Sequence, residues 1–216
     1  MPRIAIENVR SGTSKLTNPP VNRLEFLLYL LLSKPICNEA EVRRLSKTKY
    51  ILNCQIGYTP TDFGEDAYEM AGWSALHECV RSAKPDMLCI LANAPGVKLE
   101  IKDGDGETPL FVAATNTSPD TIQVLLEAGA NPNAMAEDGW SAIMVAVRAG
   151  RYGQTEALLK AGANMNEGGD MFQHGCLNLA QGMASGQMGV RQSEGESYEE
   201  AKDKYKRILA LLRSHM

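Results

Sequence analysis

The chain has 216 residues, of which 44% are hydrophobic and 22% charged, and this composition is typical of a soluble protein with one continuous core. Its formal net charge of −4 disfavours a nucleic-acid partner, because Lys and Arg supply most of the affinity for a phosphate backbone. The start lacks an apolar stretch of signal-peptide length, and the odd number of cysteines, five, fits reduced thiols in a cytoplasmic protein.

The first third of the chain is predicted to form a helical N-terminal cap over residues 21–69, after an irregular segment at residues 1–20. Val21–Lys34 is an apolar run that is too short, and too closely flanked by charge, to cross a membrane. We therefore expect a buried helix there. A second helix is expected over Asn38–Lys47, followed by an enlarged exit loop at residues 48–70.

Three related strings follow at a nearly constant interval. GWSALHECV, GETPLFVAA and GWSAIMVAV begin at Gly72, Gly106 and Gly139, which are 34 and 33 residues apart. A second string, LLEAGANPNA from Leu125, recurs as LLKAGANMNE from Leu158. A fixed period of this length is typical of stacked repeats, in which each unit contacts only its neighbours.

Each repeat is predicted to contain two short helices with a turn before them and a loop after them. Thr108 can cap a first helix, and Pro109 suits its first turn, where a missing N–H costs nothing. Gly129 and Gly162 can take the left-handed conformation that ends a helix. Neither helix buries its apolar side alone. We expect neighbouring repeats to cover the apolar positions Leu110, Ala113, Leu125 and Leu126.

The order of these signals resembles the ankyrin repeat. Thr108-Pro109-Leu110 is followed by Leu125-Leu126, then by Gly129-Ala130 and Asn133, and three copies lie in about residues 70–166. The resemblance implies an all-α solenoid of stacked helix-loop-helix units that are joined by hairpin loops. The regions on either side are then diverged caps of a single ankyrin-repeat domain.

The C-terminal cap is predicted to span residues 167–216 and to complete one domain over the whole chain. MFQHGCLNLAQ, which contains Leu177, is the counterpart of a first helix, and Tyr198–Leu212 is the displaced second helix. A segment rich in Gly, Ser, Gln and Glu lies between them at about 182–197, and we expect it to form a loop. Terminal repeats are commonly atypical because their outer faces meet water.

No arrangement of residues indicates catalysis, a cofactor or a metal. Cys176 lies two residues after His174, but no Asp or Asn stands nearby to orient such a pair. The resemblance implies a structural hydrogen bond for His77, while Cys79 is expected inside the stack, in no known zinc pattern. Asp103–Glu107 lacks the later ligands of a calcium loop, so we interpret it as the acidic tip of a hairpin.

The resemblance places function on the concave face, which is formed by the hairpin tips and the exposed ends of the first helices. In ankyrin proteins this face commonly binds a protein. Trp73 and Trp140, the two tryptophans of the chain, follow repeat glycines, and we expect both to act as aromatic anchors. The other candidate partner-binding positions are Met70, Ala71, Arg81, Ser82, Asp105, Glu107, Thr115, Asn116, Glu137, Asp138 and Arg148.

The leading interpretation is a non-enzymatic, cytoplasmic module that binds a protein and inhibits or sequesters it, without a cofactor, a membrane or nucleic acid. The acidic tips favour a partner with a basic surface. Three alternatives stay open: an immunity-type neutraliser of a basic toxin or nuclease, an adaptor that joins two partners, and a small enzyme built on the irregular ends. The oligomeric state is open in all of them.

Overall fold

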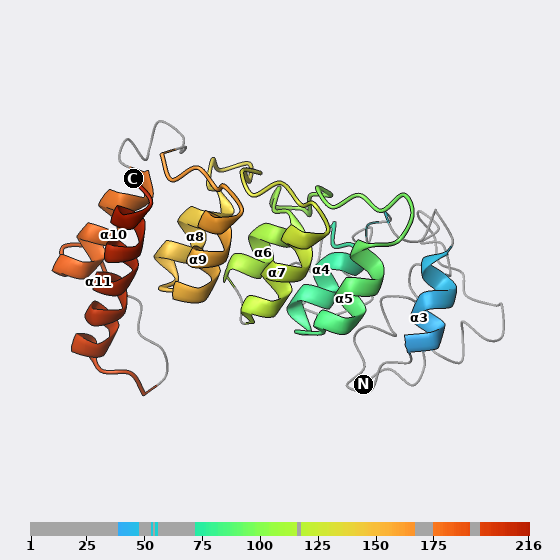
Figure 1. Cartoon of the computed structure of the whole chain (residues 1–216), viewed down its shortest axis with the longest axis horizontal. Helices are drawn as coiled ribbons and strands as arrows, with labels where there is room; N and C mark the ends of the chain where they lie inside the picture. The colour runs from blue at the N-terminus through green and yellow to red at the C-terminus, as the bar shows by residue number, and fades with distance from the viewer. Residues whose placement is uncertain are drawn as a thin grey trace, which may run out of the picture.

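The computed structural model describes residues 39–47, 53, 55, 72–115, 118–166, 175–190 and 195–216. The helices in these ranges form pairs that stack side by side into an elongated all-α solenoid, as predicted (Figure 1). The pairs are α4 (Ala75–Arg81) with α5 (Pro85–Ala92), α6 (Pro109–Thr115) with α7 (Pro119–Glu127), α8 (Ala142–Arg148) with α9 (Tyr152–Lys160), and α10 (Gly175–Ser185) with α11 (Tyr198–Ser214).

Each pair contributes one helix to each of two layers. The first helices α4, α6, α8 and α10 pack one after another in one layer, and the second helices α5, α7, α9 and α11 pack in the other. The loops between pairs run along one edge of the stack, at the top of Figure 1. One hairpin tip therefore recurs along this edge in every repeat.

The helix ends agree with the signals in the sequence. The Thr108 hydroxyl accepts a hydrogen bond from the Phe111 N–H at 3.3 Å, and Pro109 begins α6. Gly129 and Gly162 have φ values of +96° and +83°, in the left-handed region that strains any residue with a side chain. They follow α7 and α9 closely, so these second helices end as predicted.

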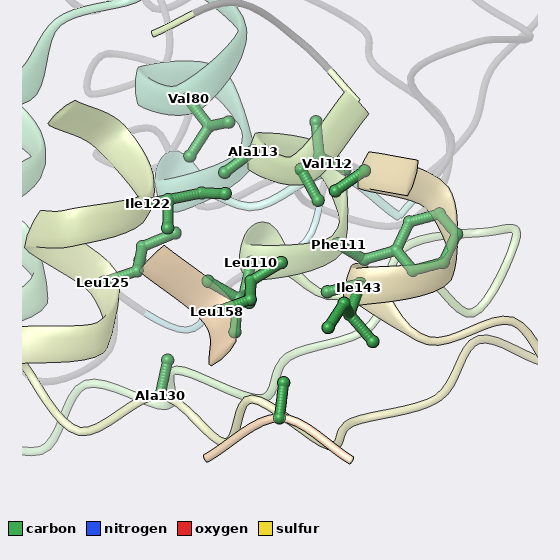
Figure 2. Packing of buried hydrophobic residues seen from close by; sticks show 14 of the residues in the cluster. Val80, Leu110, Phe111, Val112, Ala113, Ile122, Leu125, Ala130, Ile143 and Leu158 are labelled. Atoms are coloured by element: carbon green, nitrogen blue, oxygen red, sulfur yellow. The ribbon is translucent and has the colours of Figure 1, made fainter. Parts of the chain in front are cut away.

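Apolar side chains between neighbouring pairs form the core (Figure 2). Leu110, Ala113 and Leu125 are buried as predicted, and Ile143 from the next repeat is buried in the same cluster. Leu126 differs from the prediction, because it is only partly buried and packs at the edge of the core. It follows Leu125 directly, and one residue further along a helix points the side chain in another direction.

Polar bonds in the exit loops fix the register between repeats. The Asn164 N–H donates to the side-chain oxygen of Asn133 at 2.7 Å. One repeat earlier, the Asn131 N–H donates to the Glu100 carboxylate at 2.7 Å. Asn133 and Glu100 therefore occupy equivalent positions, and each holds the backbone of the repeat that follows.

Asn53 has the same role before the first regular repeat. Its side-chain oxygen accepts a hydrogen bond from the Lys98 N–H at 2.6 Å. Gln55, two residues later, forms an isolated antiparallel bridge with Ser74. In addition, α3 (Glu39–Ser46) packs against α5, as each second helix packs against the next. Thus α3 is the second helix of a further, N-terminal repeat.

The enlarged exit loop that we expected at residues 48–70 is described only at Asn53 and Gln55. The rest of that range, like the helix predicted at Val21–Lys34, lies outside the described residues.

In the C-terminal cap, α11 covers the helix predicted at Tyr198–Leu212. It begins with a capping box: the Ser197 hydroxyl accepts from the Glu200 N–H at 3.3 Å, and the Glu200 carboxylate accepts from the Ser197 N–H at 2.8 Å. The Tyr205 hydroxyl donates to the Arg148 carbonyl at 2.9 Å, which ties α11 to the end of α8.

The loop of the C-terminal cap begins later than predicted. We expected it from residue 182, but α10 continues to Ser185. The reason is packing, since Met183 and Ala184 are buried in the core and keep the last turn helical. The segment is rich in small and polar residues, as noted from the sequence, but its apolar residues Met183 and Ala184 decide where the helix ends.

Leu125→Ala is expected to lower the free energy of unfolding by about 2–5 kcal/mol, because it leaves a cavity between repeats. Leu126→Ala makes the same chemical change at a partly exposed position and should cost less. Urea denaturation followed by far-UV circular dichroism measures both losses. Equal losses, or a loss below about 1 kcal/mol for Leu125→Ala, would contradict this packing.

Candidate functional site

Acidic side chains occupy the hairpin tips of the second and third regular repeats. Asp105, Glu137 and Asp138 are exposed. The Asp103 carboxylate accepts from the N–H groups of Asp105 at 3.1 Å and Glu107 at 2.8 Å, and the Asp103 N–H donates to the Glu107 carbonyl at 3.0 Å. Asp103–Glu107 is therefore a tight hairpin tip, as predicted.

Glycines let successive tips approach closely. A Cβ on Gly72 would lie 2.7 Å from the Gly104 nitrogen, and a Cβ on Gly106 would lie 2.9 Å from the Glu137 nitrogen. Both glycines have a φ of +75°, where a side chain would also be strained. This close approach brings the carboxylates of neighbouring tips into one acidic group.

Glu107 lies within this acidic group. Burial, which is the largest cause, and the negative charges of Asp103, Asp105 and Asp138 together raise the pKa of Glu107 to about 7. Ionisation of the Glu107 carboxyl near neutral pH therefore costs free energy. A cation placed over the tips would lower that cost, so the group is chemically suited to a basic ligand.

His77 links the first and second regular repeats. Its Nδ1 accepts a hydrogen bond from the Ser74 N–H at 3.1 Å, and in that arrangement its Nε2 donates to the Glu107 carbonyl at 3.1 Å. Burial lowers the pKa of His77, against the opposing effects of the Glu107 carbonyl and the Asp103 charge. The ring is fully buried, so its hydrogen bonds are structural, as predicted.

Each tryptophan lies beside the arginine that ends the same first helix. The guanidinium carbon of Arg81 is 5.9 Å from the centre of the Trp73 ring, and that of Arg148 is 5.0 Å from the centre of the Trp140 ring. Both arginines are exposed. Two equivalent cation–π pairs are thus presented two repeats apart.

The two tryptophans differ in exposure, against expectation. Trp73 is partly exposed, whereas Trp140 retains only 8% of its surface and belongs to the hydrophobic core. Trp140 therefore has little area left for a partner to bury, which argues against the role of interface anchor that we expected for it. Its ring instead supports Arg148 from below.

Glu78 is a residue that sequence reasoning missed. Its side chain is fully buried and accepts two hydrogen bonds from Arg81, at 2.8 and 3.0 Å, and a third from the Ser82 hydroxyl. The signal that could have revealed it is its position: the equivalent residues of the next two repeats are Val112 and Val145. A carboxylate at a core position needs a cation nearby.

The remaining predicted positions contribute less. Thr115 is partly buried, and its hydroxyl donates to the Val112 carbonyl at 2.8 Å. Met70, Ala71 and Asn116 lie outside the described residues. The described part of the predicted site therefore consists of acidic tips at one edge of the first-helix layer and arginine–tryptophan pairs that reach its other edge.

The residues considered for catalysis have structural settings. Burial raises the pKa of Cys176 to about 12, so its thiol does not ionise near neutral pH, and His174 lies outside the described residues. Among the described residues, no group of three or more His, Cys, Asp or Glu side chains could hold a metal ion. No helix in the described ranges has the length and apolar character needed to cross a membrane.

The chain is similar to one protein family and to two known proteins over part of its length. The ankyrin-repeat family model matches residues 76–168 as three copies. NF-kappa-B inhibitor delta of Mus musculus is 38% identical over 69 residues, which cover 32% of this chain and 21% of that protein. E3 ubiquitin-protein ligase KEG of Arabidopsis thaliana is 32% identical over 104 residues, which cover 47% of this chain and 6% of that protein.

The fold and the acidic, arginine-bearing surface define a repeat scaffold of the kind that binds other proteins. The family-model match shows three ankyrin repeats at residues 76–168, as the sequence predicted. Ankyrin repeats indicate a protein–protein interaction module, and the family is generally non-enzymatic. The chain spans about a fifth or less of the two relatives named above.

Glu107→Gln is expected to stabilise the protein at pH 8 relative to the wild type, and to do so less at pH 4. The raised pKa of about 7 means that the folded wild type binds a proton more tightly than the unfolded chain. The stability from that proton is present at acid pH and lost as pH rises through 7. Denaturant melts at both pH values measure the difference in free energy of unfolding between the variant and the wild type. The lowered pKa of His77 has the opposite effect on stability, but it is present in both proteins and cancels in the difference. A pH-independent difference would contradict the assignment.

Trp140→Ala is expected to cost about 3–5 kcal/mol of stability, because it removes a ring from the core. Trp73→Ala is the matched control, since it removes the same side chain at the equivalent but partly exposed position, and it should cost less. Urea melts of the two variants give the comparison. Similar losses would mean that the two rings are buried alike.

Proposed function

We propose that the concave face binds a protein partner with a basic surface and thereby inhibits or sequesters it. The observation that carries the proposal is the acidic group on the hairpin tips. Asp105, Glu137 and Asp138 are exposed, and the partly buried Glu107 lies beside them with a raised pKa. A basic surface placed on the tips offsets this repulsion, and it also speeds the encounter.

Trp73 supplies the apolar part of the proposed contact. It is partly exposed, and it lies next to Arg81, whose position is fixed by the buried Glu78 carboxylate. A large, pre-organised aromatic side chain loses little entropy when a partner covers it. The acidic tips would then set encounter rate and orientation, while Trp73 contributes more to holding the complex.

The inhibitory part of the proposal is supported by one relative. NF-kappa-B inhibitor delta is an inhibitor by name, and its similarity to this chain covers 69 residues. A basic toxin or nuclease is one class of partner with the required surface. Cys89 and Cys176, two of the described cysteines, are free thiols, which favours a reducing compartment such as the cytoplasm for this interaction.

The test begins with affinity purification of the partner from the native cell, followed by titration of the purified partner. Trp73→Ala is expected to weaken binding by more than about 1 kcal/mol, as for an interface anchor. Asp105→Lys is expected to slow association and to change its salt dependence, because exposed charges mainly steer. Surface plasmon resonance at two salt concentrations separates the two effects.

Gln123→Ala is the matched control for these variants, because Gln123 is exposed on α7, in the layer of second helices. It should leave affinity and association rate unchanged. If the partner binds the Trp73→Ala/Asp105→Lys double variant as tightly as the wild type, the concave face is not its binding site. Loss of binding with Gln123→Ala alone would point to the opposite layer.

A further inference from the structure

The two Trp–Arg pairs are equivalent in position but not in charge. Arg81 donates two hydrogen bonds to the Glu78 carboxylate, which is fully buried, so its charge is compensated within the repeat. In the third regular repeat the position of Glu78 is taken by Val145, which brings no charge. The two arginines thus share a repeat position and an aromatic neighbour, and differ in the residue that faces them.

Arg148 remains uncompensated in the part of the chain that the structure describes. No carboxylate of these residues forms an ion pair with it, and its guanidinium contact is with the ring of Trp140 at 5.0 Å. Its backbone is fixed too, because its carbonyl accepts a hydrogen bond from the Tyr205 hydroxyl at 2.9 Å. Arg148 is therefore an exposed cation whose backbone is held by Tyr205 and whose guanidinium lies against the ring of Trp140.

We propose that Arg148 is the specificity-determining cation of the concave face and receives a carboxylate of the bound protein, whereas Arg81 does not. This proposal rests on the proposed function and names the chemistry of one contact within it. Covering Arg148 without a counter-charge would strand a desolvated cation, which is costly. A partner carboxylate removes that cost and matches the planar guanidinium with two parallel hydrogen bonds.

The same geometry constrains the partner. α8 carries Arg148 at its end, while Glu137 and Asp138 lie on the hairpin tip just before its start. A helix of this length spans roughly 10 Å, at 1.5 Å per residue. The bound surface therefore combines a basic region over the tips with an acidic side chain about one short helix away. That opposite polarity fixes the direction in which the partner lies across the repeats.

A phage-displayed library of random peptides, selected on the full-length protein, tests this chemistry without the native partner. We expect the selected peptides to be enriched in Asp or Glu beside basic residues. Arg148→Ala should weaken their binding by about tenfold or more, as loss of one partner of a covered ion pair does. Arg81→Ala, made together with Glu78→Val so that no buried carboxylate is left unpaired, is the matched control. It should change their affinity less than about twofold, since that arginine is already paired.

Val145→Glu gives a second, independent test, because it rebuilds the Glu78 arrangement beside Arg148. Val145→Glu should lower the affinity for the acidic peptides as much as Arg148→Ala does. Circular dichroism and thermal melts should show that the fold is retained. Arg148→Lys should restore only part of the affinity, since an ammonium keeps the charge but not the planar pair of donors. If Val145→Glu does not fold, the comparison of Arg148→Ala with Glu78→Val/Arg81→Ala decides alone.

The outcomes separate this proposal from the proposed function. Peptides that lose affinity with Trp73→Ala or Asp105→Lys but bind Arg148→Ala like the wild type would overturn the role of Arg148 and leave the concave face in place. Peptides that are indifferent to all of these variants would overturn both. A selection that yields no acidic peptide, or equal losses for Arg148→Ala and Glu78→Val/Arg81→Ala, would also overturn the role assigned to Arg148.

Discussion

Burial between neighbouring repeats is the constraint on which the rest of this structure depends. None of the described helix pairs covers its own apolar side, so Leu110 and Ala113 of one repeat are buried only because Ile143 and its neighbours belong to the next. The buried His77 ring reinforces this dependence, because it joins the start of α4 to the Glu107 carbonyl one repeat later. Each repeat is consequently held in a fixed position and orientation relative to its neighbours.

A fixed register makes the outer surface a set of equivalent positions, and the residues at these positions differ in chemistry from repeat to repeat. The position after the repeat glycine holds Trp73, Glu107 and Trp140 in turn, which gives one partly exposed ring, one half-buried acid and one buried ring. The core position of Glu78 is valine in the next two repeats. This difference accompanies the difference between the two arginines, because Arg81 is paired with Glu78 while Arg148 contacts the ring of Trp140.

The period and the turn residues were sufficient to predict the stack, because Thr108, Pro109 and the glycines act locally through caps and left-handed turns. What the sequence did not reveal depends on contacts made elsewhere in the chain. The burial of Trp140 could not be separated from the exposure of Trp73 by motif, since both follow a glycine in the same string. The continuation of α10 to Ser185 follows from the burial of Met183, which a Gly-rich composition concealed.

The central claim is that a protein lies along the hairpin tips and first helices, and hydrogen–deuterium exchange of the free and bound protein tests it most directly. The account predicts that bound partner slows exchange at the tips around Asp105 and Asp138 and at the end of α8 around Arg148, and leaves the exposed side of α5, α7 and α9 unchanged. Protection confined to those second helices, or to α11, would contradict it.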